Sequence, residues 1–103
     1  MYKLIVIFRK PPDVIAMENR WSQEFVARAE TMPGLRRVSV SRVVGAPGGT
    51  TDLHLIHEFY FDDLTALQEA MTSEAGQLAG QALMGFAGDH VSLAFAEHLE
   101  EDR

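Results

Sequence analysis

The sequence contains no cysteine, which excludes disulfide bonds, thiolate metal sites, iron–sulfur clusters and cysteine nucleophiles. It also lacks any apolar run near the roughly 20 residues that span a bilayer. The short apolar stretch Tyr2–Phe8 is followed by Arg9-Lys10 and has no small-residue cleavage site, so it predicts a buried strand and not a signal peptide. We therefore expect a cytoplasmic protein with no membrane partner.

Basic residues are scarce. The chain has 9 Lys and Arg against 15 Asp and Glu, and a net charge of −6. This balance disfavours phosphate binding and predicts no nucleic-acid partner. The nearest basic cluster, Arg36, Arg37 and Arg42, lies on a predicted strand, where charge is typical of a solvated edge.

Cofactor and metal signatures are absent as well. The sequence has no Gly-x-Gly-x-x-Gly turn, no phosphate loop and no Gly-x-Ser-x-Gly turn. The 4 histidines do not show the spacing of a metal site. We expect no bound cofactor and no metal.

The length of 103 residues suits one domain, residues 1–103, and 47% hydrophobic content is typical of a folded globular chain. A domain of this size has a thin core, so oligomerisation is one way to bury more surface.

Strands and helices are predicted to alternate in the order β-α-β-β-α-β. Residues with β-branched, aromatic or alternating patterns predict strands at Tyr2–Arg9, Leu35–Gly45, Asp52–Phe61 and His90–His98. Asp13 is expected to begin a first helix that ends at Met32-Pro33-Gly34, and Asp62-Asp63 to begin a second. The second helix is expected to break at Thr72-Ser73 and to end before a turn at Gly85–Asp89.

This order describes a ferredoxin-like α+β sandwich, in which both helices lie on one face of an antiparallel four-stranded sheet. The first and third strands would be central. Their second face would then carry apolar side chains in water, which is typical of an interface. We predict a homodimer with two sheets packed face to face, and the residues of that face or its rim are Ile5, Ile7, His54, Ile56, Glu58 and Tyr60.

Several segments together resemble the EthD-like proteins of the dimeric α/β-barrel superfamily. They are Arg9-Lys10-Pro11-Pro12-Asp13 after the first strand, the helix carrying Trp21, Met32–Arg37, and Phe61–Leu64. The resemblance covers nearly the whole chain and implies a subunit that dimerises into an α/β barrel. It also implies a link to the breakdown of small organic compounds, in which relatives are described as reductases or accessory proteins.

One position departs from that family. Many EthD-like proteins have Trp-x-x-x-His in the first helix, whereas Phe25 stands here in the place of the histidine. Any acid–base chemistry that this histidine performs in relatives is therefore not available to this chain through the same residue.

His57 is the candidate catalytic residue. It is predicted to face the helices among apolar side chains, where a histidine can act as an acid or base near neutral pH. The alternative is a hydrogen-bonded core histidine without a chemical role. The aromatic residues that could line a pocket for a small apolar ligand, or could simply fill the core, are Phe8, Trp21, Phe25, Phe59 and Phe86.

Three functions remain open from the sequence. The first is cofactor-free redox or isomerisation chemistry on a small hydrophobic compound, with His57 transferring the proton. The second is a non-enzymatic binding or accessory protein that uses the same cavity. The third is a structural or regulatory dimer whose aromatic residues leave no cavity.

Overall fold

The computed structural model describes residues 1–103 and contains four strands and two helical regions in the predicted order. The strands are β1 (Tyr2–Arg9), β2 (Arg37–Arg42), β3 (Leu53–Phe61) and β4 (Val91–Glu97). The first helical region comprises α1 (Val14–Arg20), the π-helical turn η1 (Trp21–Val26) and α2 (Ala27–Ala29), and the second comprises α3 (Leu64–Thr72) and α4 (Glu74–Ala87).

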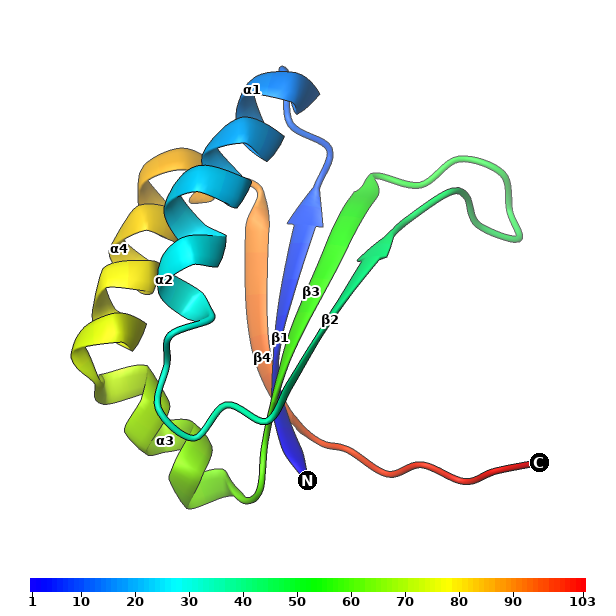
Figure 1. The fold of residues 1–103 in the computed structure, drawn as a ribbon. Coiled ribbons are helices and arrows are strands. Elements are labelled where there is room, and N and C mark those ends of the chain that lie inside the picture. Colours follow the sequence, from blue (N-terminus) through cyan, green and yellow to red (C-terminus); the bar gives the residue numbers. More distant parts are fainter.

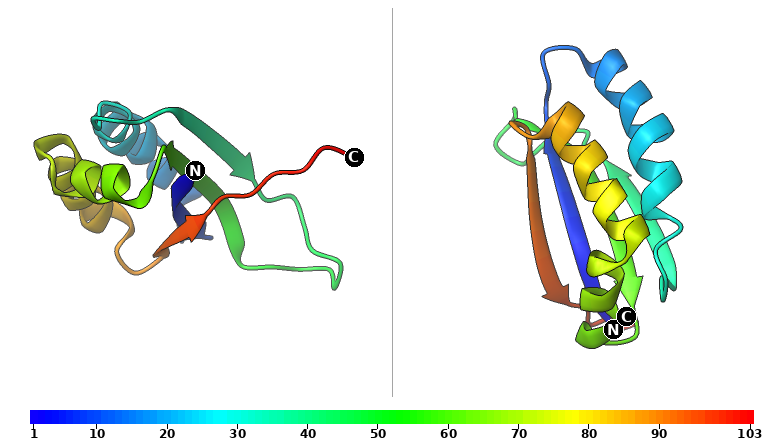
Figure 2. Two further views of the ribbon diagram at one scale, coloured as in Figure 1. Left: turned by 90° about the horizontal axis from the view of Figure 1, so that it is seen from below. Right: turned by 90° about the vertical axis from the view of Figure 1, so that its left-hand side faces the viewer.

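The strands form one antiparallel sheet in the order β2-β3-β1-β4. Both helical regions lie on the same face of this sheet, and the other face is not covered by any helix (Figure 1; Figure 2). The ferredoxin-like fold and the central position of β1 and β3 are therefore confirmed. None of the helices combines the length and hydropathy that crossing a membrane requires.

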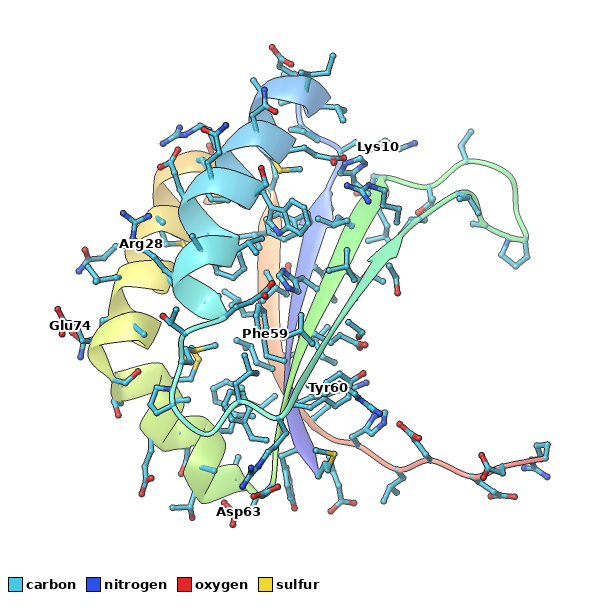
Figure 3. The ribbon with its side chains drawn as sticks, viewed as in Figure 1. Lys10, Arg28, Phe59, Tyr60, Asp63 and Glu74 are labelled. Atoms are coloured by element: carbon cyan, nitrogen blue, oxygen red, sulfur yellow. The ribbon has the colours of Figure 1, made fainter.

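The core lies between the helices and the two central strands. Side chains alternate along each strand. In β3, Phe59 points toward the helices and its neighbour Tyr60 toward the opposite face (Figure 3). The largest fully buried side chains are Phe8, Phe59, Phe61, Leu55, Leu67, Leu83, His57 and Val6.

The first helical region begins as the sequence predicts, because the Asp13 side chain accepts a hydrogen bond of 3.0 Å from the backbone N–H of Ala16. Its middle turn is not regular, however. Residues Trp21–Val26 form a π-helical turn, which periodicity alone does not reveal. Both large rings of the turn, Trp21 and Phe25, are buried against β3.

The second helical region breaks at Ser73, as predicted. The hydroxyl of Ser73 accepts a hydrogen bond of 3.1 Å from the N–H of Gly76 and so begins α4. A Cβ atom on Gly76 would lie 2.1 Å from the carbonyl oxygen of Ala70, so only glycine fits at this corner. The prediction of a turn from Gly85 onward was wrong, since α4 continues to Ala87 and accommodates Gly85 on its exposed side.

The β2–β3 hairpin also differs in detail from the sequence prediction. Strand β2 covers Arg37–Arg42 and is shorter than the predicted Leu35–Gly45. In β3, Leu55 pairs with Phe8 while Leu53 pairs with Arg9, so His54 is an extra residue without a partner on β1. This is a β-bulge, and a bulge disrupts the strict alternation of side chains.

Candidate functional site

His57 lies at the centre of the core and is fully buried, with 0% of its surface exposed. Its Nδ1 atom accepts a hydrogen bond of 3.2 Å from the indole N–H of Trp21. The rings of Trp21, Phe25 and Phe59 surround it, with centroid distances of 5.5, 5.7 and 4.2 Å. Its second nitrogen, Nε2, has no hydrogen-bond partner.

The surroundings of His57 determine its protonation state. Burial disfavours the charged imidazolium and lowers the pKa of His57 from 6.5 to about 4. The ring is therefore neutral near pH 7 and carries one proton. Because an indole nitrogen can only donate, Nδ1 must be the accepting nitrogen, and the proton must sit on Nε2.

The five aromatic residues predicted to line a pocket form a packed cluster instead. Phe8, Trp21, Phe25 and Phe59 are buried, and half-buried Phe86 stacks on Phe8 at a centroid distance of 6.4 Å. No cavity of the structure is lined by His57, Trp21 or Phe59. The predicted common pocket is absent because the rings themselves occupy the space between β3 and the first helical region.

An apolar cavity lies elsewhere in the same layer. An inner cavity of about 30 Å³ separates the helices from the sheet, and Phe25 is the one member of the aromatic cluster that lines it. Its lining residues are Leu4, Phe25, Ala29, Met32, Met71, Gly76, Ala79, Gly80, Leu83 and Leu93.

A larger open hollow adjoins the inner cavity beside β4. We call it the β4 recess; it has a volume of about 200 Å³ and is lined by Leu4, Met71, Leu93, Ala94 and Phe95. Leu4, Met71 and Leu93 line both spaces, so the recess and the inner cavity are adjacent and share these side chains as a wall. Leu93 and Phe95 are 43% and 52% exposed although they pair with the core residues Val6 and Leu4.

The β4 recess was not recognised in the sequence. Its one visible signal is the apolar face Val91, Leu93 and Phe95 of the last strand, which by itself indicates core residues. The helices cover Val91 but leave the other two partly uncovered, because they pack mainly on β1 and β3.

His54 does not lie where alternation predicts it. Its Nε2 donates a hydrogen bond of 2.7 Å to Glu18 of α1, on the helical side of the sheet. The prediction placed His54 on the dimer face or its rim. The bond to Glu18 excludes the face itself, and the β-bulge at this residue is the reason.

Glu18 joins the helices to the hairpin. It also accepts a hydrogen bond of 2.7 Å from Arg42 of β2, and this bond is the main cause that lowers the pKa of Glu18. Partial burial raises the pKa by less, and the bond from His54 lowers it further.

The helix-free face carries the other residues predicted for it. Ile5, Ile7 and Ile56 lie there and are each partly exposed in the single chain. Tyr60 is only 4% exposed, because the Arg37 guanidinium covers its ring at 4.2 Å and the His98 ring packs edge-on at 4.9 Å.

Glu58 is the centre of a hydrogen-bond network on this face. It accepts bonds from Lys3 at 3.0 Å, Tyr60 at 3.0 Å and Ser39 at 3.1 Å. Partial burial raises its pKa, but these three bonds together outweigh it, and the pKa of Glu58 lies below its usual value. Nowhere do three His, Asp or Glu side chains gather as metal ligands would.

Comparisons with known proteins first establish the fold of the chain. No family model matches the chain. A dimeric protein of unknown function from Bacteroides fragilis, with a ferredoxin-like fold, is 20% identical with a TM-score of 0.64; the match covers 94% of this chain and 95% of that one. SnoaB from Streptomyces nogalater, a cofactor-independent oxygenase, is 13% identical with a TM-score of 0.71, over 97% of this chain and 94% of that one. At these identities the likeness shows the fold alone.

A stronger match supplies the family. The crystal structure of an ethyl tert-butyl ether D (EthD) family protein from Bacillus halodurans superposes with a TM-score of 0.92 at 34% identity. The match covers 96% of this chain and 99% of that one. The chain with the β4 recess and the buried Trp21–His57 pair thus belongs to the EthD family, within the dimeric α/β-barrel proteins of ferredoxin-like fold.

Proposed function

We propose that this protein is a homodimer that binds a small, uncharged hydrophobic organic molecule in the β4 recess and the adjoining inner cavity. The observation that supports this most directly is the lining of the recess, because all five of its residues are hydrophobic. A site without charged or polar side chains cannot compensate an ionic ligand for its lost hydration, so it favours a neutral apolar one.

The size of the recess is suited to one small ring. Its volume of about 200 Å³ exceeds that of an engineered apolar protein cavity of about 150 Å³ that binds benzene. Leu93 and Phe95 remain half exposed in the single chain, and fully burying such a side chain is worth about 1.5–3 kcal/mol. A ligand that covers both side chains gains part of this free energy.

The dimer is supported by the helix-free face and by relatives. Ile5, Ile7 and Ile56 leave apolar surface partly exposed on that face, and a structural relative with the same fold is dimeric. Size-exclusion chromatography with light scattering should give twice the chain mass of 11.5 kDa. A mass of one chain at micromolar concentration would contradict the dimer.

Ligand binding can be tested with a variant that fills the cavity. Gly80 of α4 lines the inner cavity, and a Cβ atom built there meets nothing within 4 Å. Gly80→Leu should therefore fill the inner cavity and exclude the ligand from that part of the site. Gly85→Leu is the matched control, because Gly85 lies on the same helix but lines neither space.

The measurement is calorimetric titration with ethylbenzene. Wild type and Gly85→Leu should bind with the same affinity, and Gly80→Leu at least tenfold more weakly, with circular dichroism reporting the fold of each variant. Equal affinity of Gly80→Leu and wild type, or no binding by wild type up to the solubility of ethylbenzene, would refute the proposed site.

A second candidate is cofactor-free conversion of the ligand, by redox or isomerisation chemistry. Two observations favour it: His57 is a titratable group buried in the core, and the cofactor-independent oxygenase SnoaB shares the fold. General acid–base catalysis contributes roughly 10²–10⁴-fold to a rate. His57→Gln should lower any turnover that is found by a comparable factor; unchanged turnover would remove His57 from the mechanism.

A further inference from the structure

The Nε2 atom of His57 is a buried hydrogen-bond donor without an acceptor. The Trp21 bond fixes the proton on this atom, since Nδ1 must accept. Leaving such a donor unpaired in the interior destabilises the fold, because the donor has lost its hydrogen bonds to water and gained none. A buried group of this kind needs an explanation, and an acceptor brought by a ligand is one.

No side chain around His57 supplies that acceptor. The rings in contact with it belong to Trp21, Phe25 and Phe59. The indole nitrogen of Trp21 donates only, and it already donates to Nδ1. The two phenylalanine rings carry no oxygen or nitrogen. The acceptor must therefore come from outside the cluster.

Phe25 connects His57 with the apolar cavity. Its ring packs edge-on against His57 at a centroid distance of 5.7 Å, and the same residue lines the inner cavity. The inner cavity of about 30 Å³ is too small for an organic molecule by itself, so a ligand that extends from the β4 recess toward His57 must displace the Phe25 ring. The π-helical turn η1 presents both Phe25 and Trp21 to His57, and such turns are frequent at functional sites.

We infer that the ligand is a neutral carbonyl compound with an apolar body, whose oxygen accepts the hydrogen bond that His57 Nε2 offers. This inference rests on the proposed function for the location of the apolar body, and it adds the polar group that the ligand carries. An anionic oxygen is excluded, because the inner cavity and the recess are lined without a cationic side chain. Aromatic or alicyclic ketones combine such an apolar body with an accepting oxygen.

Two probes of equal shape separate this inference from the proposed function. Acetophenone and ethylbenzene differ in one group, a carbonyl in place of a methylene. Wild type should bind acetophenone about tenfold more tightly than ethylbenzene, because about 1.4 kcal/mol from one satisfied donor corresponds to a factor of ten. In His57→Phe, which keeps a ring but has no donor, the ratio of the two affinities should fall to about one.

Nuclear magnetic resonance of wild type gives an independent measurement that needs no folded variant. Acetophenone should shift the His57 Nε2–H proton and nitrogen signals, and ethylbenzene should leave the nitrogen signal nearly unchanged. Phe25→Ala should bind acetophenone more tightly than wild type does, because no ring has to be displaced.

The outcomes are distinguishable. Wild type that binds ethylbenzene but shows no preference for acetophenone, or a preference that persists in His57→Phe, overturns the inference and leaves the apolar site intact. Acetophenone that binds without shifting the Nε2 signals of His57 would also overturn the inference and leave the apolar site intact. Wild type that binds neither probe overturns the proposed function itself.

Discussion

The burial of neutral His57 predicts a loss of stability in mild acid. The pKa of this histidine falls from 6.5 to about 4 on folding. Below pH 6.5 His57 takes up a proton in the unfolded chain but not in the folded chain. Proton binding therefore stabilises the unfolded state relative to the folded state as the pH falls. The stability that His57 contributes is complete above pH 6.5 and is lost progressively between that value and pH 4.

The magnitude follows from the size of the shift. Each unit of pKa difference is worth about 1.4 kcal/mol, so lowering the pH from about 7.5 to about 4.5 should cost ~2–3 kcal/mol through His57. For a domain of this length, that loss corresponds to a fall of ~10–20 °C in melting temperature. Urea unfolding at a fixed protein concentration measures it directly.

His57→Gln is the control, because glutamine does not titrate and can still accept the bond from Trp21. The hydrogen-bonded carboxylates Glu18, Glu58 and Glu100 have lowered pKa values, so their contributions are lost at lower pH and are common to both proteins. Wild type should lose ~2–3 kcal/mol more than His57→Gln between the two pH values. Equal losses in the two proteins would show that His57 is not held neutral in the core.

Four further substitutions have defined outcomes. Gly76→Ala places a Cβ atom 2.1 Å from the Ala70 carbonyl oxygen and should destabilise the chain by about 3 kcal/mol in urea unfolding. Gly80→Ala, on the same helix with free space, should stabilise it by up to ~1 kcal/mol. If Gly76→Ala stabilised the chain and Gly80→Ala destabilised it, the described packing at Gly76 would be wrong. Asp63→Ala removes the bond to the N–H of Ala66 at 2.8 Å and should lower thermal stability by ~1 kcal/mol. Ile56→Arg puts a charge on the proposed dimer face and should yield monomers in light scattering; an unchanged dimer would place the interface elsewhere.

The sequence predicts the fold well because its strongest signals are local. Apolar residues on both faces of Tyr2–Arg9 and Asp52–Phe61 indicate central strands, and the structure places β1 and β3 at the centre. Asp13 and Asp63 begin the helices through bonds to the N–H groups three residues later. Such caps and periodicities depend on neighbouring residues only, so they can be read from the chain.

The site is less predictable because it depends on contacts between distant segments. One additional residue in β3 turns His54 away from the face that alternation assigns to it. The β4 recess exists because the helices leave Leu93 and Phe95 partly uncovered, and no local pattern specifies that placement. The pairing of Trp21 with His57 joins residues that lie 36 positions apart.

The helical layer contacts the sheet through different interactions on its two sides, at α1 and at β4. On one side Glu18 bonds Arg42 and His54, and Trp21 bonds His57, so three side-chain hydrogen bonds join the helices to the sheet. On the other side no side-chain hydrogen bond joins β4 to α3 or α4, and only apolar contact holds them. The helices should therefore separate from the sheet more readily at β4 than at α1. We expect faster amide hydrogen exchange beside β4, and this local opening would let a ligand enter there without unfolding the rest of the domain.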